Sequence, residues 1–447
     1  TNRMLIIVND DIVFCLTAHA DSAELFDKAS NVFYNSLVSR RPSKPKVNLS
    51  VSKAEKICND LASTDTLVAK TALGALSYYD FNTTELPYIY TSLKKNYPDD
   101  TLTDGVRATL IKKLKSVNND STMNVLVNLY PDLKGKDDIK AAALSAIPQL
   151  NKKTGYDIYL KLLVSDPPLK AKESYETFSP LIDSVEFAAA HLEQILPFNK
   201  YSNYRTYLLR VARNIADEKN SQYDKILRAN YVAIMASAES DMKSYLSLKD
   251  SSTNEWMGNM YNYMRLIGKI KGEDFNDKFT KTYLEKDPNG LYAPDAIGAR
   301  IYNQLPNNKL LVNKYLDSLG TRYDLMEAYN NQKQLVMVPL KYRTQSEYAK
   351  LCLYQNIATD EDNGSPTTSI KLLGSITKNG SVYYAFKFSL PEKNDKNELF
   401  GLAGPYKPGA TKLNFKRYYA LTNYDILKTN WRLQAAKMVK PLLEAYK

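Results

Sequence analysis

The chain has 447 residues, of which 44% are hydrophobic and 24% are charged. This length and composition exclude wholesale disorder and a single small core, so we expect several structural units or one long array. The formal net charge of +11 comes from 60 basic and 49 acidic residues mixed along the chain, which argues against a dedicated nucleic-acid site. No apolar run approaches the length of a membrane span, so we expect no transmembrane segment.

Residues 1–45 predict the tail of a truncated α+β domain followed by a linker. Met4–Val8 and Asp11–Thr17 are apolar β-rich runs around a polar turn, which predicts a hairpin. One amphipathic helix is expected over Ser22–Val38, with its apolar face formed by Leu25, Phe26, Ala29, Phe33 and Leu37. Since a hairpin and one helix cannot cover this much apolar surface, we expect the first part of the domain to precede Thr1.

A repeat of helical pairs is predicted over residues 50–185. Three segments share a core of small residues and Leu, and they align on Leu73, Leu110 and Leu144 with steps of 37 and 34 residues. These segments are Leu67–Leu76, Gly105–Leu114 and Asp138–Ile147, and their partner helices are expected over Thr84–Tyr97, Ser121–Leu133 and Gly155–Val164. Small residues such as Ala108 let two helices approach closely. One pair cannot bury both of its faces, so we expect successive pairs to stack.

The repeat resembles HEAT-type repeats, whose first helix often reads Val-Arg-x-x-Ala-Leu-x-x-Leu. Val68–Leu76, Val106–Leu114 and Ile139–Ile147 approximate this pattern. Tetratricopeptide repeats have a similar period, but their Trp-Leu-Gly-Tyr order is missing here. The resemblance implies a mainly α fold, a HEAT/TPR-like solenoid of helical hairpins, and a role as a protein-binding scaffold.

Residues 186–358 predict a less regular, tyrosine-rich helical region. Helices are expected over Tyr204–Ala216, Tyr223–Ala238, Trp256–Ile270, Phe275–Leu284 and Lys309–Leu319. The chain contains 34 tyrosines, and those on these helices have two interpretations. They form aromatic packing between the helices, or they line a concave groove that binds an extended ligand.

Residues 367–447 predict a small antiparallel β module closed by a helix. The strongest hairpin signal consists of Ser369–Ile376 and Val382–Phe388 around a turn at Lys378-Asn379-Gly380. Further strands are expected at Leu399–Ala403 and Tyr418–Thr422. The closing helix, Trp431–Tyr446, is expected to bury Leu433, Ala436, Val439 and Leu443.

The order of these regions, with Leu427-Lys-Thr-Asn-Trp431 near the end, resembles the C-terminal regions of long extracytoplasmic TraB/GumN-type bacterial proteins. This resemblance implies a place in the periplasm or at the cell surface of a bacterium, as part of a larger multidomain protein. The Gly-x-x-His motif of that family's proposed hydrolase chemistry does not occur in the sequence, so the resemblance implies no activity.

Few side chains suggest chemistry. His19 and His191 are the only histidines and lie in different regions, so we expect neither a histidine-based triad nor a histidine metal site. Cys15, Cys58 and Cys352 lack metal-ligand spacing and are expected to be small buried hydrophobes. Paired carboxylates are expected to cap helices or lie in turns, and these are Asp99-Asp100, Asp137-Asp138 and Asp360-Glu361-Asp362.

Gly401–Gly409 is glycine-rich, but it lacks the Gly-Lys-Ser/Thr ending of a phosphate-binding loop, so we interpret it as a turn. We predict no catalytic, cofactor-binding or metal site, and no particular binding residues.

The sequence therefore favours a non-catalytic scaffold that binds protein partners, including those of membrane-associated complexes. The alternative is the substrate-positioning region of a hydrolase that acts on peptide or polysaccharide. That alternative requires two buried carboxylates close together in a deep cleft, and sequence cannot reveal such a pair.

Overall fold

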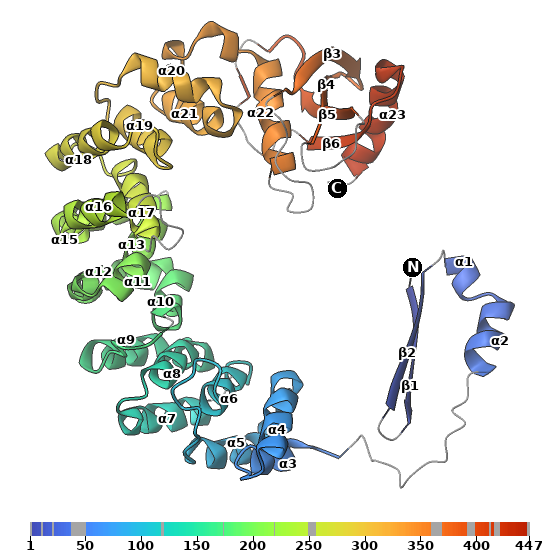
Figure 1. The fold of residues 1–447 in the computed structure, drawn as a ribbon, viewed down its shortest axis with the longest axis vertical. Coiled ribbons are helices and arrows are strands. Elements are labelled where there is room, and N and C mark those ends of the chain that lie inside the picture. Colours follow the sequence, from blue (N-terminus) through green and yellow to red (C-terminus); the bar gives the residue numbers. More distant parts are fainter. Residues whose placement is uncertain are drawn as a thin grey trace. The chain divides into compact units, whose positions relative to one another are not determined.

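The computed structural model describes residues 2–9, 12–19, 22–36, 51–117, 120–172, 174–218, 220–248, 256–358, 369–390, 398–410, 413–414 and 421–444. These residues form the predicted fold class, which is mainly helical with a hairpin near the N-terminus and a four-stranded antiparallel sheet near the C-terminus (Figure 1). The stacking of helical pairs into a solenoid stays a prediction. None of the described helices is both long and apolar enough to cross a bilayer.

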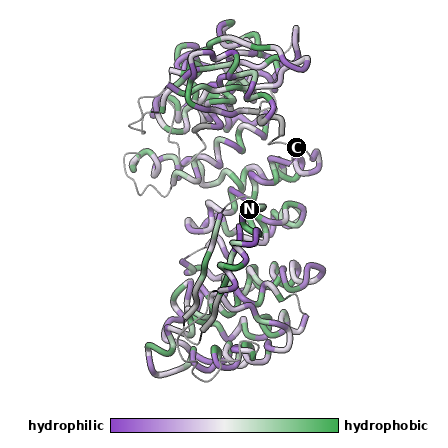
Figure 2. The backbone as a smooth tube through the Cα atoms, turned by 90° about the vertical axis from the view of Figure 1, so that its right-hand side faces the viewer, coloured by the Kyte–Doolittle hydropathy of each residue, from purple (hydrophilic) through white to green (hydrophobic). Residues whose placement is uncertain are grey.

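Contacts divide the chain into two compact units. Unit 1 comprises Thr1–Ile139 with Gln149–Asn151, and unit 2 comprises Lys140–Pro148 with Lys152–Lys447. Hydrophobic and hydrophilic residues alternate along the helices of both units, as expected for helices that pack on one side (Figure 2).

The N-terminal hairpin consists of β1 (Asn2–Asn9) and β2 (Ile12–His19), which pair antiparallel as predicted. The single helix predicted after it is wrong, because the structure has two, α1 (Ser22–Leu25) and α2 (Lys28–Ser36). The Asp27 carboxylate accepts a hydrogen bond from the Ser30 N–H at 2.6 Å, which starts a new helix at this point.

The apolar face predicted for this segment is also wrong. Leu25 is buried, but Phe26 and Phe33 are 56% and 53% exposed, and Tyr34 is buried instead. Arg3 on β1 accounts for this orientation, since its guanidinium donates to the Leu25 carbonyl at 2.7 Å and lies 4.2 Å from the centre of the Tyr34 ring. The same guanidinium also lies over the Phe26 ring, 5.2 Å from its centre, whereas Phe33 faces water. Leu37 lies outside the described residues.

Helices follow at all the positions where the repeat predicts them. They are α3 (Ala54–Asp60), α4 (Thr66–Tyr78), η1 (Thr83–Glu85), α5 (Leu86–Leu93), α6 (Val106–Leu114), α7 (Asp120–Leu129), η2 (Tyr130–Leu133) and α8 (Asp137–Leu150). Asn82 and Glu85 form a reciprocal capping box at the start of the η1–α5 segment. Pro131 does not end its helix outright but converts the last turn to the 3₁₀ helix η2.

Unit 2 continues with helices as far as residue 358. They are α9 (Gly155–Ser165), α10 (Ser174–Asp183), α11 (Val185–Ala190), α12 (Leu192–Ile195), η3 (Leu196–Lys200), α13 (Ser202–Asp217), α14 (Ser221–Ala229), α15 (Tyr231–Met235), α16 (Ala238–Ser247), α17 (Met257–Ile267), α18 (Asp274–Lys286), α19 (Ala293–Tyr302), α20 (Lys309–Asp317), α21 (Leu319–Asn331), η4 (Leu335–Met337), η5 (Leu340–Tyr342) and α22 (Gln345–Ala358).

The single helix predicted over Tyr223–Ala238 is wrong, because it is divided at Asn230 and again before α16. The Asn230 side chain donates to the Ile226 carbonyl at 3.0 Å and so satisfies an acceptor at the end of α14. The spacing of hydrophobic residues carries no information about such a local polar contact. It therefore predicted one continuous helix across Asn230.

Tyrosines of unit 2 mainly form aromatic packing, the first of the two interpretations above. Tyr204, Tyr263, Tyr283 and Tyr348 are fully buried. The ring of Tyr204, for example, lies edge-on to Phe178 with ring centres 4.8 Å apart.

Four of the described arginines are buried and link backbone carbonyls to carboxylates, and we call them the bridging arginines. They are Arg107, Arg205, Arg300 and Arg322. Each guanidinium donates to a backbone carbonyl, and each also pairs with a carboxylate, namely Asp100, Asp241, Asp277 and Glu347 respectively, at 2.5–3.0 Å. Arg322, for example, donates to the carbonyls of Leu316 and Asp317 at the end of α20, which have no partner within their own helix, while it neutralises Glu347.

Gly155 marks a close approach of two helix backbones. A Cβ atom added there would lie 2.6 Å from the Ile147 carbonyl oxygen and 2.9 Å from the Pro148 Cα on α8. Gly298 on α19 is the opposite case, with nothing within 4 Å of an added Cβ.

We therefore expect Gly155→Ala to lower the free energy of unfolding by about 1–3 kcal/mol, because backbone atoms must move apart. Gly298→Ala should raise it by about 0.5–1 kcal/mol through helix propensity alone. Urea unfolding followed by tryptophan fluorescence measures both changes, since Trp256 and Trp431 lie in unit 2. Equal effects of the two substitutions would contradict the close approach at Gly155.

The C-terminal sheet has the strand order β3 (Lys371–Lys378), β4 (Ser381–Phe388), β5 (Leu399–Tyr406) and β6 (Leu421–Ile426). The predicted turn is confirmed, with Asn379 and Gly380 at φ of 51° and 72° between β3 and β4. The fourth strand runs over Leu421–Ile426, later than the predicted Tyr418–Thr422, of which residues 418–420 lie outside the described residues.

Alternate residues of the two central strands pack on different helices. Tyr383 and Phe400 belong to a core with α23 (Trp431–Glu444), whereas Phe386 and Ala403 belong to a core that includes α19 to α22. The face predicted for α23 is partly wrong, because Leu433 is 54% exposed, while Val439 is buried as expected. Ala435 and Gln434 take the buried positions.

The glycine-rich run Gly401–Gly409 is mostly strand rather than the turn we expected, since β5 extends to Tyr406. A Cβ atom at Gly401 would lie 2.5 Å from the Leu353 Cδ2 of α22. The glycine therefore allows the helix to approach the sheet closely.

Candidate binding groove

A groove with a volume of about 640 Å³ lies among five helices of unit 2. The end of α13, the start of α14, and the helices α17, α19 and α21 contribute its lining residues. Leu291, which is 61% exposed, supplies apolar surface, Met264 and Leu325 lie buried behind the lining, and Tyr302 is the one tyrosine among the described lining residues. This groove is therefore not the tyrosine-rich groove of the second interpretation.

Carboxylates outnumber cations on the lining of this groove. Six acidic side chains, Asp217, Glu218, Asp224, Asp295, Asp324 and Glu327, lie there with two basic ones, Arg265 and Lys269. The Lys269 Nζ atom is already engaged, since it lies 3.1 Å from a carboxylate oxygen of Asp217. The groove is thus locally acidic in a chain whose formal net charge is +11.

Asp295 is the half-buried carboxylate of the groove and lies in the first turn of α19. Burial raises its pKa to about 6, with the positive charge of Arg265 opposing the rise and the negative charge of Asp324 adding to it. The carboxyl group is therefore mainly ionised at neutral pH and mainly protonated near pH 5.

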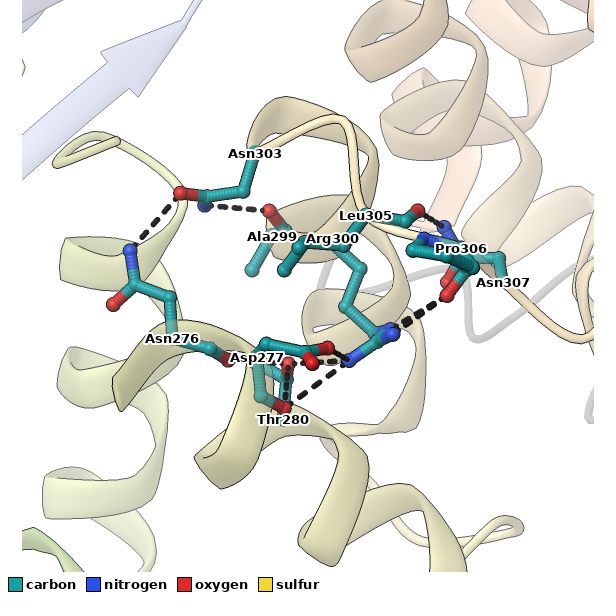
Figure 3. A network of polar contacts seen from close by, with 9 residues as sticks. All are labelled: Asn276, Asp277, Thr280, Ala299, Arg300, Asn303, Leu305, Pro306 and Asn307. Atoms are coloured by element: carbon teal, nitrogen blue, oxygen red, sulfur yellow. Dashed lines mark hydrogen bonds and ion pairs between the residues drawn. The ribbon is translucent and has the colours of Figure 1, made fainter. Parts of the chain in front are cut away.

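A network of side-chain hydrogen bonds fixes the helices that form the walls (Figure 3). The Asn303 amide donates to the Ile267 carbonyl at the end of α17 at 2.8 Å, and its oxygen accepts a hydrogen bond from Asn276 of α18 at 3.0 Å. Bridging Arg300 joins Asp277 of α18 at 2.7 Å to the Pro306 carbonyl beyond α19. These contacts hold α19 against α17 and α18, so two of the helices that line the groove, α17 and α19, are fixed relative to each other.

Gly298 lies one turn after Asp295 on the same side of α19 and lines the groove. Since nothing lies within 4 Å of an added Cβ, a side chain placed there would enter the groove without a clash.

The two histidines belong to different units. His19 is exposed at the end of β2 in unit 1. His191 separates α11 from α12, and its ring centre is 4.4 Å from that of Phe187. Neither histidine lines the groove.

The prediction of three buried cysteines holds for Cys58 and Cys352 but fails for Cys15, which is exposed on β2. A two-stranded hairpin has one face free, and strand alternation places Cys15 on it.

The paired carboxylates mostly lie where we expected them. Asp137 and Asp138 occupy the first turn of α8, and Asp99 accepts a hydrogen bond from the Val106 N–H at 3.0 Å at the start of α6. Asp100 differs, because it is buried and pairs with bridging Arg107 rather than being solvated.

Among the residues that the structure describes, no group of three or more His, Cys, Asp and Glu side chains is arranged to hold a metal ion. The loop Asp360-Glu361-Asp362 lies outside the described residues.

The sequence did not reveal this groove, because its carboxylates come from segments between residues 217 and 327. The one local signal is the spacing of Asp295, Gly298 and Tyr302, which places them on one side of a helix. Asp295 and Asp324 meet in part the condition stated for the hydrolase alternative, but Asp324 is exposed, so that alternative stays a prediction.

Comparisons of this chain with family models, with curated proteins and with solved structures find no match.

Proposed function

We propose that this chain is a non-catalytic helical scaffold that binds protein partners, and that the groove of unit 2 takes an extended cationic segment of such a partner. The observation that carries the proposal is the groove of about 640 Å³, whose lining has more carboxylates than cations. Lysine and arginine side chains complement this lining, and the apolar stems of such side chains suit the exposed Leu291.

The resemblance to HEAT-type repeats supports the scaffold role, since stacked helical pairs commonly present long binding surfaces. The setting is proposed from the TraB/GumN resemblance alone. It is extracytoplasmic, in the periplasm or at the surface of a bacterium, within a larger protein that joins a membrane-associated complex.

The test is the affinity of the full chain for a labelled extended peptide that contains lysine and arginine, measured by fluorescence anisotropy. We expect binding that weakens as salt increases, because the attraction is electrostatic. Gly298→Lys should weaken binding by about tenfold or more, since it places a cation and a long side chain in the groove. Gly298→Ala is the matched control and should bind as the wild type does.

Two outcomes would contradict the proposal. One is equal affinity of the wild type and Gly298→Lys for the cationic peptide. The other is equal affinity of the wild type for a peptide in which every lysine and arginine is replaced by glutamine. Non-specific attraction cannot imitate the expected result, because the net charge of +11 repels a cationic peptide.

A further inference from the structure

Two exposed tyrosines flank α13 in unit 2, and an arginine of α13 lies over each. Tyr175 of α10 and Tyr261 of α17 are 42% and 37% exposed, and they are the two exposed tyrosines among the described residues of this unit. The Arg210 guanidinium lies 5.8 Å from the centre of the Tyr175 ring, and that of Arg213 lies 5.4 Å from the centre of the Tyr261 ring. Since α13 packs against both α10 and α17, these two pairs are neighbours, and we call them the Arg–Tyr strip.

Neither arginine of the strip pairs with a carboxylate among the described residues. Arg213 donates to the amide oxygens of Asn262 and Asn214 at 3.1 and 3.4 Å, and the exposed Arg210 makes no hydrogen bond or ion pair with a described residue. The bridging arginines differ, since each of them already neutralises a carboxylate. A guanidinium that lies over a ring keeps N–H groups on its edge for a ligand, and two of them match the two oxygens of a carboxylate. The strip therefore suits an anionic group of a binding partner.

The strip borders the groove of unit 2. On α13, Asp217 of the groove lining lies four residues after Arg213. On α17, Arg265 of the lining lies four residues after Tyr261. Residues with this spacing lie on one side of a helix, so the strip continues the groove by one turn on each of these two helices. From Asp217 to Arg210 is about 10 Å along the helix axis, a distance that about three residues of an extended chain span.

We propose that the partner segment held by this groove carries acidic residues beside its basic stretch, and that their carboxylates bind Arg210 and Arg213. The inference rests on the proposed function and adds the chemistry of the partner next to the groove. A segment whose charge changes sign fits the change from carboxylates to arginines along α13. A uniform polyanion such as single-stranded DNA fits less well, because the carboxylates of the groove repel its neighbouring phosphates.

The test is the affinity of the full chain for pairs of labelled peptides, measured by fluorescence anisotropy. All peptides contain the same stretch of lysine and arginine, and within a pair this stretch continues with either acidic residues or glutamines. The continuation follows the stretch in one pair and precedes it in the other, so that either chain direction is covered. We expect the acidic continuation to strengthen binding by about fivefold or more in at least one pair, because charge-assisted hydrogen bonds form.

Arg210→Gln combined with Arg213→Gln should abolish this difference, so that the two peptides of a pair bind equally. The matched control is Arg432→Gln combined with Lys437→Gln on α23, which removes the same two charges outside the lining of the groove. Arg432 also lies over an aromatic ring, 4.6 Å from the centre of the Trp431 ring. The control should keep the full gain from the acidic continuation.

Equal binding of both peptides to the wild type in each pair would overturn this inference. The proposed function would still stand in that case if Gly298→Lys weakened the binding of all the peptides. A gain that persists without Arg210 and Arg213, or that the control also loses, would overturn the inference by assigning the gain to net charge. Tighter binding of single-stranded DNA than of the peptides would overturn it as well. If the wild type bound none of the peptides, the proposed function would fail together with this inference.

Discussion

Replacing Asp241 with alanine should lower the free energy of unfolding by about 3–5 kcal/mol, because it leaves the charge of a buried arginine without its partner. Asp241 is 1% exposed and pairs with bridging Arg205 at 2.5 Å. Its second oxygen accepts hydrogen bonds from Asn259 and Tyr263, each at 2.9 Å. Alanine removes all three contacts together, and water cannot replace them at this depth.

The matched control for this prediction lies on the same helix. Glu239 of α16 pairs with Lys278 at 2.8 Å, but both side chains are more than half exposed. Glu239→Ala should change the free energy of unfolding by less than about 0.5 kcal/mol, since water screens an exposed pair. Urea unfolding followed by tryptophan fluorescence compares the two variants. A loss of similar size in both variants would mean that burial does not determine how much the Arg205–Asp241 pair contributes to the free energy of unfolding.

Replacing Asp295 with asparagine should make the protein more stable at pH 7.5, by up to about 3 kcal/mol, but nearly unchanged at pH 4. Burial raises the pKa of Asp295 from 3.8 to about 6 in the folded chain. The folded state therefore binds more protons than the unfolded state between these values, and this carboxyl lowers stability as the pH rises from about 4 to 6. Asparagine resembles the protonated form at every pH, so it avoids that loss.

The measurement is urea unfolding at several pH values between 4 and 8. Gly298→Ala, one turn away on α19, is the control, because a change in helix propensity should add the same increment at every pH. If the gain in stability from Asp295→Asn were also independent of pH, the proposed link between protonation of Asp295 and the free energy of unfolding would be wrong. An activity against peptide or polysaccharide that disappears in Asp295→Asn would instead favour the hydrolase alternative.

Helix positions could be predicted from this sequence because they depend on local spacing and on caps within a few residues. The repeat helices and the hairpin at Asn379-Gly380 are examples, since glycine supplies the positive φ that the turn requires. Which face of a helix is buried depends on contacts from elsewhere. Arg3 contacts Leu25 of α1 and Tyr34 of α2 while Phe33 faces outward, and nothing in the sequence of α2 encodes that contact.

The acidic groove was missed for the same reason, on a larger scale. Asp217, Asp295 and Asp324 belong to three helices, and their proximity depends on how those helices pack. The sequence around each carboxylate indicates only an ordinary solvated side chain. The spacing of Asp295 and Gly298 makes them neighbours on α19, but it carries no sign of the walls opposite them.

The core shared by α19 to α22 and the C-terminal sheet has a consequence for synthesis of the chain. Leu351 and Leu353 of α22 pack in one cluster with Phe386 and Ala403 of the sheet. The ribosome releases the helices before the strands, so the part of α22 that packs on the sheet stays uncovered until residues near 403 have emerged. We therefore expect a nascent chain ending near residue 370 to expose this apolar surface to water.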